Sequence, residues 1–366
     1  MNSYLHREKQ SGFDLYIELL PVKELETLGE GDTPVVPLKS LAEEIGIKNF
    51  SAKNEGMNPT ASFKDRAMAV AFSRAREIGA GEAVVASAGN ASSSAAAYGA
   101  LYGIPVYAVV PASTSLAKVA QAIVYGAKIV LVDGGYSDSF MIVKNYGEKF
   151  GGFNVSTTYI NPYVIAGYKT MAYEIAGQCE VLPDVIMIPV GAGPLLAGLY
   201  EGFNDFLKMG LINKIPKLVA IQSDRCCPIV RAFNEEKPVR EWTMTEATIA
   251  SGMNDELRGY TEDGDRTLSY IRLSGGAAVT VSEREIIDSV HRLGKQGIYA
   301  EPASASGIAA TAKLKRQGWI SNEASVMMIV TGNGLKNPLP TIDLPEIRIT
   351  SDEQLRQVIC NCEINM

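Results

Sequence analysis

The stretch NPTASFKDR, residues 58–66, opens a helix and places one lysine at an unusual position. Its first two residues, Asn-Pro, predict a turn, because proline disfavours the helical conformation for the residue before it. Ser62 followed by Asp65 is typical of a capping box. Apolar residues then recur at a spacing of three or four, which predicts a helix: Ala67, Met68, Ala71, Phe72, Ala75 and Ile78. Lys64 therefore lies in the first helical turn.

A cation at this position is disfavoured. The positive end of the helix dipole costs it about 0.3–1 kcal/mol, and burial would lower its pKa further. A lysine held partly neutral is what covalent attachment to an aldehyde cofactor requires. On the helix pattern alone, a surface lysine screened by water is the simpler interpretation. Other motifs in the sequence are needed to distinguish a cofactor-binding lysine from a surface lysine.

Composition describes a globular protein with an ample core. The chain has 366 residues, 46% of them hydrophobic, and a net charge of −7, which predicts two domains. The acidic balance argues against nucleic acid as a partner. The polar N-terminus does not resemble a signal peptide, and no apolar run of about twenty residues predicts a membrane span.

The cysteines do not indicate a metal site or a disulfide framework. There are five of them, an odd number, and the pairs at 226–227 and 360–362 lack the spacing of zinc ligands. With only two histidines in the chain, no metal is expected. Free thiols and a reducing, cytoplasmic location are expected instead.

Strands and helices are predicted to alternate along the chain. Expected strands cover residues 48–53, 83–86, 106–110, 129–132, 185–190, 218–221, 279–281 and 326–330. Expected helices cover 91–102, 116–125, 138–150, 163–179, 195–207, 283–295 and 305–317, with a helical lead-in over 1–30. The polar segment 240–275 is interpreted as connecting structure or a mobile lid. This alternation predicts an α/β protein with two parallel or mostly parallel sheets flanked by helices, and a site in the cleft between them.

Three strand-to-helix junctions could hold a ligand. Residues 87–92 and 191–198 are rich in small residues, so backbone N–H groups at the helix starts could bind an anion. Pro194 has no N–H, so the donors of the second junction must be Ala192, Gly193 and Leu195. The third junction, residues 331–336, places a threonine hydroxyl at a strand tip.

Five motifs together resemble the fold-type II pyridoxal-phosphate enzymes. They occur in the family's order: the opening stretch, then residues 87–90, 191–193, 301–305 and 331–336. The chain is most similar to threonine synthase, also through residues 161–163 and 167–170. Their joint occurrence overrides the surface-lysine interpretation. The resemblance implies a tryptophan synthase β-like fold with the cofactor between two domains, and a homodimer.

The resemblance also implies roles for individual residues. Lys64 would be the Schiff-base lysine, Asn90 would bind the phenolic oxygen of pyridoxal 5'-phosphate, and Thr331 would face its pyridine nitrogen. The phosphate would lie on Gly191, Ala192, Gly193 and Leu195, and the substrate carboxylate on Ser87, Ala88, Gly89 and Ala91. The expected division is a larger, phosphate-binding domain from 1–60 and 151–345, a smaller domain from 61–150 and a C-terminal extension from 346–366.

The pattern departs from threonine synthase where the substrate is chosen. Val164 stands where that family has an arginine that grips the phosphate of phosphohomoserine, and Thr158 and Tyr159 replace its usual asparagine and serine. Valine cannot replace an arginine–phosphate contact. A phosphorylated substrate should therefore bind poorly unless Lys169, Arg258 or another cation takes over.

Three functions stay open at this point. The first is elimination or replacement at Cβ or Cγ of a small-molecule amino acid, as in threonine synthase. The second is a threonine or serine dehydratase-like ammonia-lyase, or a β-replacing synthase with a different leaving group. The third is a non-catalytic sensor of the cofactor or of an amino acid, which the joint presence of Lys64, Asn90 and Thr331 disfavours.

Overall fold

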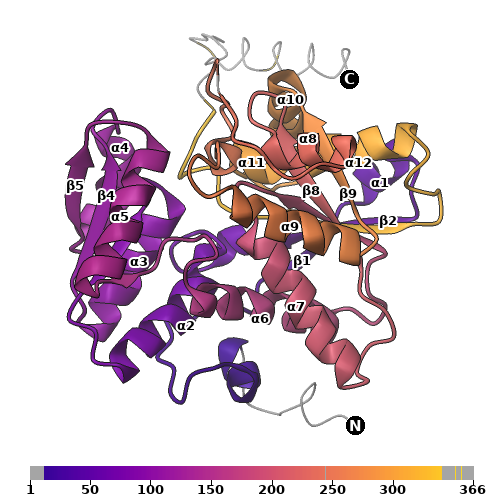
Figure 1. Cartoon of the computed structure of the whole chain (residues 1–366). Helices are drawn as coiled ribbons and strands as arrows, with labels where there is room; N and C mark the ends of the chain where they lie inside the picture. The colour runs from indigo at the N-terminus through magenta and orange to yellow at the C-terminus, as the bar shows by residue number, and fades with distance from the viewer. Residues whose placement is uncertain (1–11, 244, 340–350, 352–355, 357–366) are drawn as a thin grey trace.

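Two β-sheets flanked by helices make up the protein (Figure 1). The computed structural model describes residues 12–243 and 245–339, together with Ser351 and Arg356. One sheet has six strands in the order β1-β2-β10-β7-β8-β9, and the other has four in the order β5-β4-β3-β6. Neighbouring strands are parallel except for β1 and β2. The predicted α/β class with mostly parallel sheets is confirmed.

The larger sheet separates two hydrophobic cores. Its strands are β1 (Val35–Pro37), β2 (Asn49–Asn54), β7 (Val185–Pro189), β8 (Lys217–Ser223), β9 (Ala277–Val281) and β10 (Ser325–Val330). Along β7, Ile186 and Ile188 enter the core shared with the smaller sheet, while Val185 and Met187 enter the core on the other face. This alternation is the period of two that a strand imposes on its side chains.

Eight helices accompany the larger sheet within the described residues. They are α1 (Lys39–Ile45), α6 (Pro162–Gln178), α7 (Pro194–Lys208), α8 (Pro228–Glu235), α9 (Thr261–Leu273), α10 (Glu283–Gly294), α11 (Pro302–Ala305) and α12 (Gly307–Arg316). The expected helix over 305–317 corresponds to α12, and the short helix α11 before it was not expected. Within the described residues, none is both long and apolar enough to span a bilayer.

The smaller sheet contains β3 (Ala83–Ala86), β4 (Val106–Pro111), β5 (Lys128–Val132) and β6 (Phe153–Asn154). Its helices are α2 (Lys64–Glu77), α3 (Asn90–Tyr102), α4 (Leu116–Val124) and α5 (Tyr136–Phe150), on the left in Figure 1. Because β6 pairs with β3, the chain stays in this sheet for a few residues beyond 150. Apart from Ser351 and Arg356, the expected C-terminal extension lies outside the described residues.

Helix α6 packs against both α2 and α7 and so joins the two halves. The contact with α2 depends on Gly167, where a Cβ atom would lie only 2.1 Å from the carbonyl oxygen of Arg66. Real Cβ atoms do not approach a backbone oxygen so closely. Glycine at 167 therefore lets the backbone of α6 approach the helix that begins at Lys64.

The predicted capping box at the start of α2 is wrong. The helix begins at Lys64 without a side-chain cap, and the Ser62 hydroxyl is buried with no partner among the described residues. Asp65 instead accepts hydrogen bonds from the backbone and hydroxyl of Thr60 at 2.7 and 2.6 Å, and from Ser94 at 2.6 Å. The acidic residue thus fixes the turn before the helix and links α2 to α3.

The segment 240–275, expected to be polar connecting structure or a mobile lid, contains a regular helix and is not irregular throughout. Among its described residues before 261 the one helix is the short 3-10 helix η3 (Ser251–Met253), and α9 follows at Thr261. This helix has two acidic residues in its first turn and buries Thr267, Leu268 and Ile271. The expected lead-in contains a 3-10 helix, η1 (Gly12–Leu19), and residues 1–11 lie outside the described part of the chain.

Candidate active site

The end of strand β10 holds the opening stretch in place. The backbone N–H of Phe63 donates to the carbonyl of Thr331 at 3.0 Å. The N–H of Asn333 donates to the carbonyl of Ala61, also at 3.0 Å. The N–H of Glu301 donates to the carbonyl of Gly332 at 3.1 Å. Three of the five motifs therefore meet at the carboxyl end of β10, directly beside Lys64.

Burial disfavours the charge on the Lys64 amine more than its neighbours favour it. It donates a hydrogen bond to the Thr157 hydroxyl at 2.7 Å and lies 4.5 Å from the centre of the Phe63 ring. Burial lowers the pKa of Lys64 from 10.5 to about 7, although the carboxylates of Glu301 and Asp255 raise it. The residue keeps some solvent exposure. A large fraction of the amine is therefore neutral at physiological pH and can act as a nucleophile or base.

Asn90 and Glu301 connect the two halves of the molecule close to this amine. The Asn90 side-chain amide, at the start of α3, donates to Glu301 Oε2 at 2.9 Å. Burial raises the pKa of Glu301 to about 7, against the opposing effects of Asn90, Lys336 and Lys64. A carboxyl group with this pKa can hold or release a proton near neutral pH.

The loop between β7 and α7 has the shape of an anion cup. Gly193 adopts φ = +101°, and a Cβ there would lie 2.2 Å from the Thr267 hydroxyl. That hydroxyl donates to the carbonyl of Ala192 at 2.5 Å and lies 2.8 Å from the hydroxyl of Tyr159. Within the described residues, no acceptor binds the N–H groups of Ala192 and Gly193. The cup therefore fits a phosphate group, which backbone donors at a helix start bind well.

Thr331 lies at the tip of β10, as the sequence indicates. Its hydroxyl is 2.7 Å from the hydroxyl of Ser304, at the start of α11, and Ser304 also accepts from the backbone N–H of Gly332 at 2.9 Å. The threonine is buried. A neutral hydroxyl is therefore held beside the site by Ser304, and no carboxylate of the described residues is hydrogen-bonded to it.

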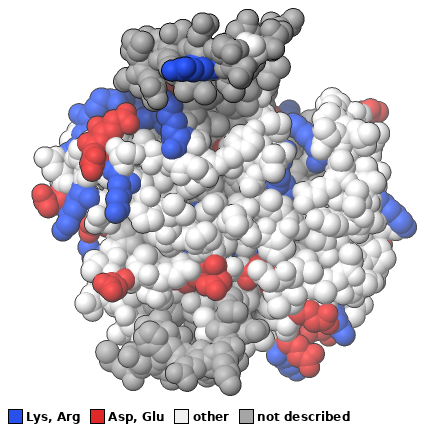
Figure 2. All heavy atoms as spheres, turned by 180° about the vertical axis from the view of Figure 1, so that it is seen from behind, with Lys and Arg blue, Asp and Glu red and all other residues white. Residues whose placement is uncertain are grey.

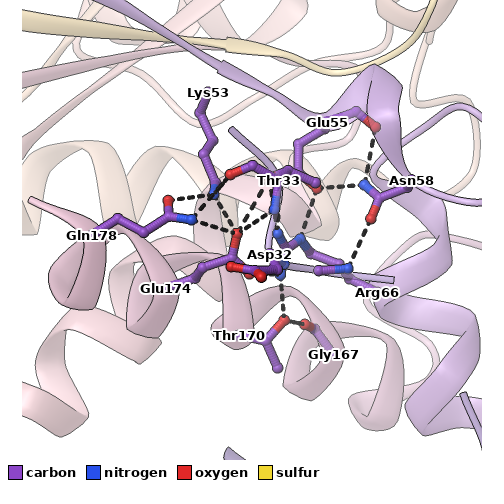
Figure 3. Close-up of polar contacts among 11 residues, drawn as sticks. Asp32, Thr33, Lys53, Glu55, Asn58, Arg66, Gly167, Thr170, Glu174 and Gln178 are labelled. Atoms are coloured by element: carbon purple, nitrogen blue, oxygen red, sulfur yellow. Dashed lines mark hydrogen bonds and ion pairs between the residues drawn. The ribbon is translucent and has the colours of Figure 1, made fainter. Parts of the chain in front are cut away.

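A buried ion network supports the segment that carries Lys64 (Figure 3). Arg66 on α2 contacts Glu55 at 2.7 Å and Glu174 on α6 at 3.0 Å, and Lys53 on β2 also pairs with Glu174. All four side chains are nearly or fully buried. Because Arg66 is two residues from Lys64, this network fixes the first turn of α2 against both β2 and α6.

Several predicted substrate residues lie around the site without a contact that defines their role. Ser87, Ala88, Gly89 and Ala91 form the junction before and at the start of α3, where Gly89 is exposed and Ala91 is buried. Thr158 is buried and lies next to Thr157. The Tyr159 hydroxyl is held by Thr267, and Val164 is fully buried in the core. Their roles in substrate binding stay predictions.

Three residues of the site did not emerge from the sequence. Thr157 contacts the Lys64 amine, Thr267 braces the glycine cup, and Asp255 is a buried carboxylate that acts on Lys64. Thr267 and Asp255 belong to the polar segment 240–275, where acidic residues look like ordinary surface. Thr157 could have been found only as the neighbour of Thr158 and Tyr159.

A family of known proteins matches this arrangement over most of the chain. The family model described as "Pyridoxal-phosphate dependent enzyme" matches residues 26–332. The chain belongs to this family. Pyridoxal 5'-phosphate is therefore confirmed as the cofactor, and the partly neutral lysine and the glycine cup fit its aldehyde and its phosphate.

Relatives of this pyridoxal-phosphate dependent enzyme include several threonine synthases. The one from Methanosarcina acetivorans is 39% identical over 335 residues, covering 90% of this chain and 82% of its own. The one from Methanocaldococcus jannaschii is 38% identical over 355 residues, covering 94% of this chain and 86% of its own. The predicted similarity to threonine synthase is confirmed.

Solved structures share the fold at lower identity. Maize serine racemase superposes with a TM-score of 0.71 at 22% identity, covering 91% of this chain and 93% of its own. Threonine deaminase isoform 2 from Solanum lycopersicum superposes with a TM-score of 0.69 at 21% identity, covering 89% of this chain and 86% of its own. These likenesses establish the fold-type II architecture and nothing finer.

Proposed function

We propose that this chain catalyses elimination or replacement at Cβ or Cγ of an amino-acid substrate, in the manner of threonine synthase. The observation that carries the proposal is the Lys64 amine, which is desolvated, has a pKa of about 7 and lies at the point where the family's motifs converge. The threonine synthase relatives, which cover most of the chain, support it.

Each part of the site would have a separate task. Lys64 would hold the cofactor covalently and then move protons between neighbouring substrate carbons, while Gly191, Ala192, Gly193 and Leu195 would bind the phosphate. Asn90 would donate to the phenolic oxygen and Thr331 would face the pyridine nitrogen. The bound cofactor supplies an electron sink that makes the substrate's Cα–H acidic. The Thr331 hydroxyl, being neutral, favours loss of a leaving group over transamination.

A dehydratase-like ammonia-lyase or a β-replacing synthase is the second candidate. It is supported by Val164, which provides no charge where threonine synthase has its phosphate-gripping arginine, and by the short glycine cup that ends at Pro194. The junction at Ser87, Ala88, Gly89 and Ala91 would hold the substrate carboxylate in either case, with Thr158 and Tyr159 near the side chain.

Two further properties belong to the proposal. We expect a cytoplasmic protein, since Cys179, Cys226 and Cys227 are free thiols.

We also expect a homodimer that binds no nucleic acid. Figure 2 shows a broad central area with few charged side chains on the face opposite to that of Figure 1, which suits a subunit contact. The proposed domain division places the cofactor between the two sheets.

Borohydride reduction tests the central role of Lys64. The purified protein should be yellow, and reduction followed by tryptic mapping should find pyridoxal phosphate attached to the peptide that contains Lys64. K64A should lose the adduct, whereas K118A on the exposed face of α4 should keep it. An adduct at another lysine would refute the proposed role.

A panel of amino acids then separates the two candidate reactions. Serine, threonine and their O-phosphorylated or homologous forms are added singly, and release of phosphate or ammonia is measured. Ammonia release without phosphate release from any substrate favours the ammonia-lyase. Efficient phosphate release from phosphohomoserine would favour threonine synthase activity and contradict the argument from Val164.

A further inference from the structure

The proposed reaction requires the Lys64 amine twice, once bound to the cofactor and once free. The amine becomes free when the amino group of the substrate takes its place on the cofactor. A lysine side chain is a flexible stem of four carbons, so its free amine keeps no fixed position without a partner. The group that holds the free amine therefore decides whether the amine stays close enough to the substrate to move protons.

A threonine hydroxyl holds this amine. Among the described residues, Thr157 is the one hydrogen-bond acceptor of Lys64, with Oγ1 2.7 Å from Nζ. The carboxylates of Glu301 and Asp255 raise the pKa of the amine through their charges, without a hydrogen bond to it within the described part of the chain. The Phe63 ring lies 4.5 Å from Nζ, but an aromatic face attracts a cation without offering a directed acceptor. Thr157 is therefore the contact that gives the amine a direction.

The loop that carries Thr157 is fixed on both sides. Before it, the hydroxyl of the fully buried Ser156 accepts from the backbone N–H of Ala86 at 2.9 Å, at the end of β3. After it, the backbone N–H of Tyr159 donates to the carboxylate of Asp263 on α9 at 3.1 Å. The first anchor belongs to the smaller sheet and the second to a helix beside the larger sheet. Thr157 thus reaches the amine from a loop that both halves of the molecule hold in place.

We infer that Thr157 is a positioning residue whose hydroxyl holds the free Lys64 amine in place during the reaction. The inference rests on the proposed function, because it assumes that Lys64 carries the cofactor and that the substrate releases it. A hydroxyl suits this task, since it can accept a hydrogen bond from an ammonium group and donate one to a neutral amine. An ionised carboxylate can only accept, so in direct contact it would favour the protonated amine and oppose its use as a base.

Cofactor uptake by the full-length apoprotein tests this contact without turnover. The rate of pyridoxal 5'-phosphate uptake is measured by stopped-flow absorbance across the neutral pH range. T157V keeps the shape of the side chain and removes the hydroxyl. The hydrogen bond to the ammonium form is charge-assisted and therefore the stronger of the two, so its loss should lower the midpoint of the pH profile by about 0.5–1 unit. T157S restores the hydroxyl and should return the midpoint to the wild-type value.

Turnover by the holoenzyme tests the consequence for the reaction. With the amino acid that the panel identifies as a substrate, T157V should lower kcat by about tenfold or more and leave KM within about twofold. T157S should recover most of the lost kcat. T280V is the matched control, because Thr280 is also half-buried and lies on β9, at the edge of the larger sheet. It should change neither the midpoint of cofactor uptake nor kcat.

Four results would overturn the inference. T157V could keep the wild-type midpoint, or it could shift the midpoint and leave kcat unchanged. T157S could be as impaired as T157V, in which case the hydroxyl alone does not restore the site. T157V could raise KM without lowering kcat, in which case the hydroxyl contacts the substrate instead. If T157V takes up no cofactor, T157S decides: uptake with the wild-type midpoint supports the inference, and no uptake refutes it.

The proposed function fails in a different way. A cofactor attached to a residue other than Lys64, or a panel in which no amino acid is turned over, would refute that function. A cofactor on Lys64 together with wild-type behaviour of T157V would refute only the role of Thr157.

Discussion

Replacing Glu174 by glutamine is expected to destabilise the protein strongly. The Glu174 carboxylate accepts hydrogen bonds from the backbone N–H groups of Asp32 at 2.9 Å and Thr33 at 2.8 Å, and it pairs with Arg66 and Lys53. Glutamine keeps one acceptor oxygen and adds two N–H groups that face these donors. The variant would leave Arg66 and Lys53 buried with Glu55 as their remaining carboxylate partner.

The expected loss is about 3–5 kcal/mol in the free energy of unfolding, the usual cost of breaking a buried ion pair from one side. Its pH dependence follows from the pKa of Glu174, which its cationic partners lower from 4.5 to about 2 despite burial. A lowered pKa in the folded state stabilises the protein above the unfolded value, and this stabilisation is lost as the pH falls towards 2. The difference between wild type and E174Q should therefore be constant at neutral pH and shrink below about 4.5.

Urea unfolding followed by circular dichroism measures this difference at several pH values. E26Q is the matched control, because Glu26 pairs with Arg76 at the surface and should contribute no more than about 1 kcal/mol. A loss below about 1 kcal/mol in E174Q, or a difference that does not shrink in acid, would refute the assignment of the network as a stabilising element.

Three further predictions concern the site itself. G193A should weaken binding of pyridoxal phosphate by about tenfold or more, because a left-handed alanine costs about 1–2 kcal/mol and its Cβ would overlap the Thr267 hydroxyl. Equilibrium dialysis measures this affinity, and an unchanged value would contradict the proposed cup. N90A should raise the pKa of Glu301 above about 7, since the amide bond stabilises the charged form; an infrared carboxyl titration that shows no upward shift would count against this pair. The rate at which the apoprotein takes up the cofactor should rise with pH to a plateau with a midpoint near the Lys64 pKa of about 7, and a midpoint near 10 in stopped-flow absorbance would show an ordinary exposed lysine.

The parts of the fold that depend on local sequence could be predicted. Strands such as 185–190 are short apolar runs followed by glycine, and the helices after them begin within one or two residues of the expected positions. The capping box at Ser62 failed for a different reason. Asp65 had the right local spacing for a cap, but Thr60 and Ser94 compete for its carboxylate, and Ser94 comes from another helix.

Contacts between residues far apart in the chain could not be predicted from the sequence either, because they depend on which elements pack together. Glu174 lies 108 residues from Arg66, and nothing in the local pattern of α6 marks it as buried and paired. A carboxylate on a helix is usually solvated, so a single sequence favours that interpretation. The network becomes visible only when Gly167 is seen to bring α6 onto α2.

Substrate choice is a second place where burial decides the interpretation. Val164 stands where threonine synthase has an arginine, and it is fully buried in the core, so its side chain offers no contact to a charged group. An arginine held by a phosphate would need a partly open position at this point of α6, and a buried valine instead packs the helix against its neighbours. The departure from the threonine synthase pattern at residue 164 is therefore a change in packing as well as a loss of charge.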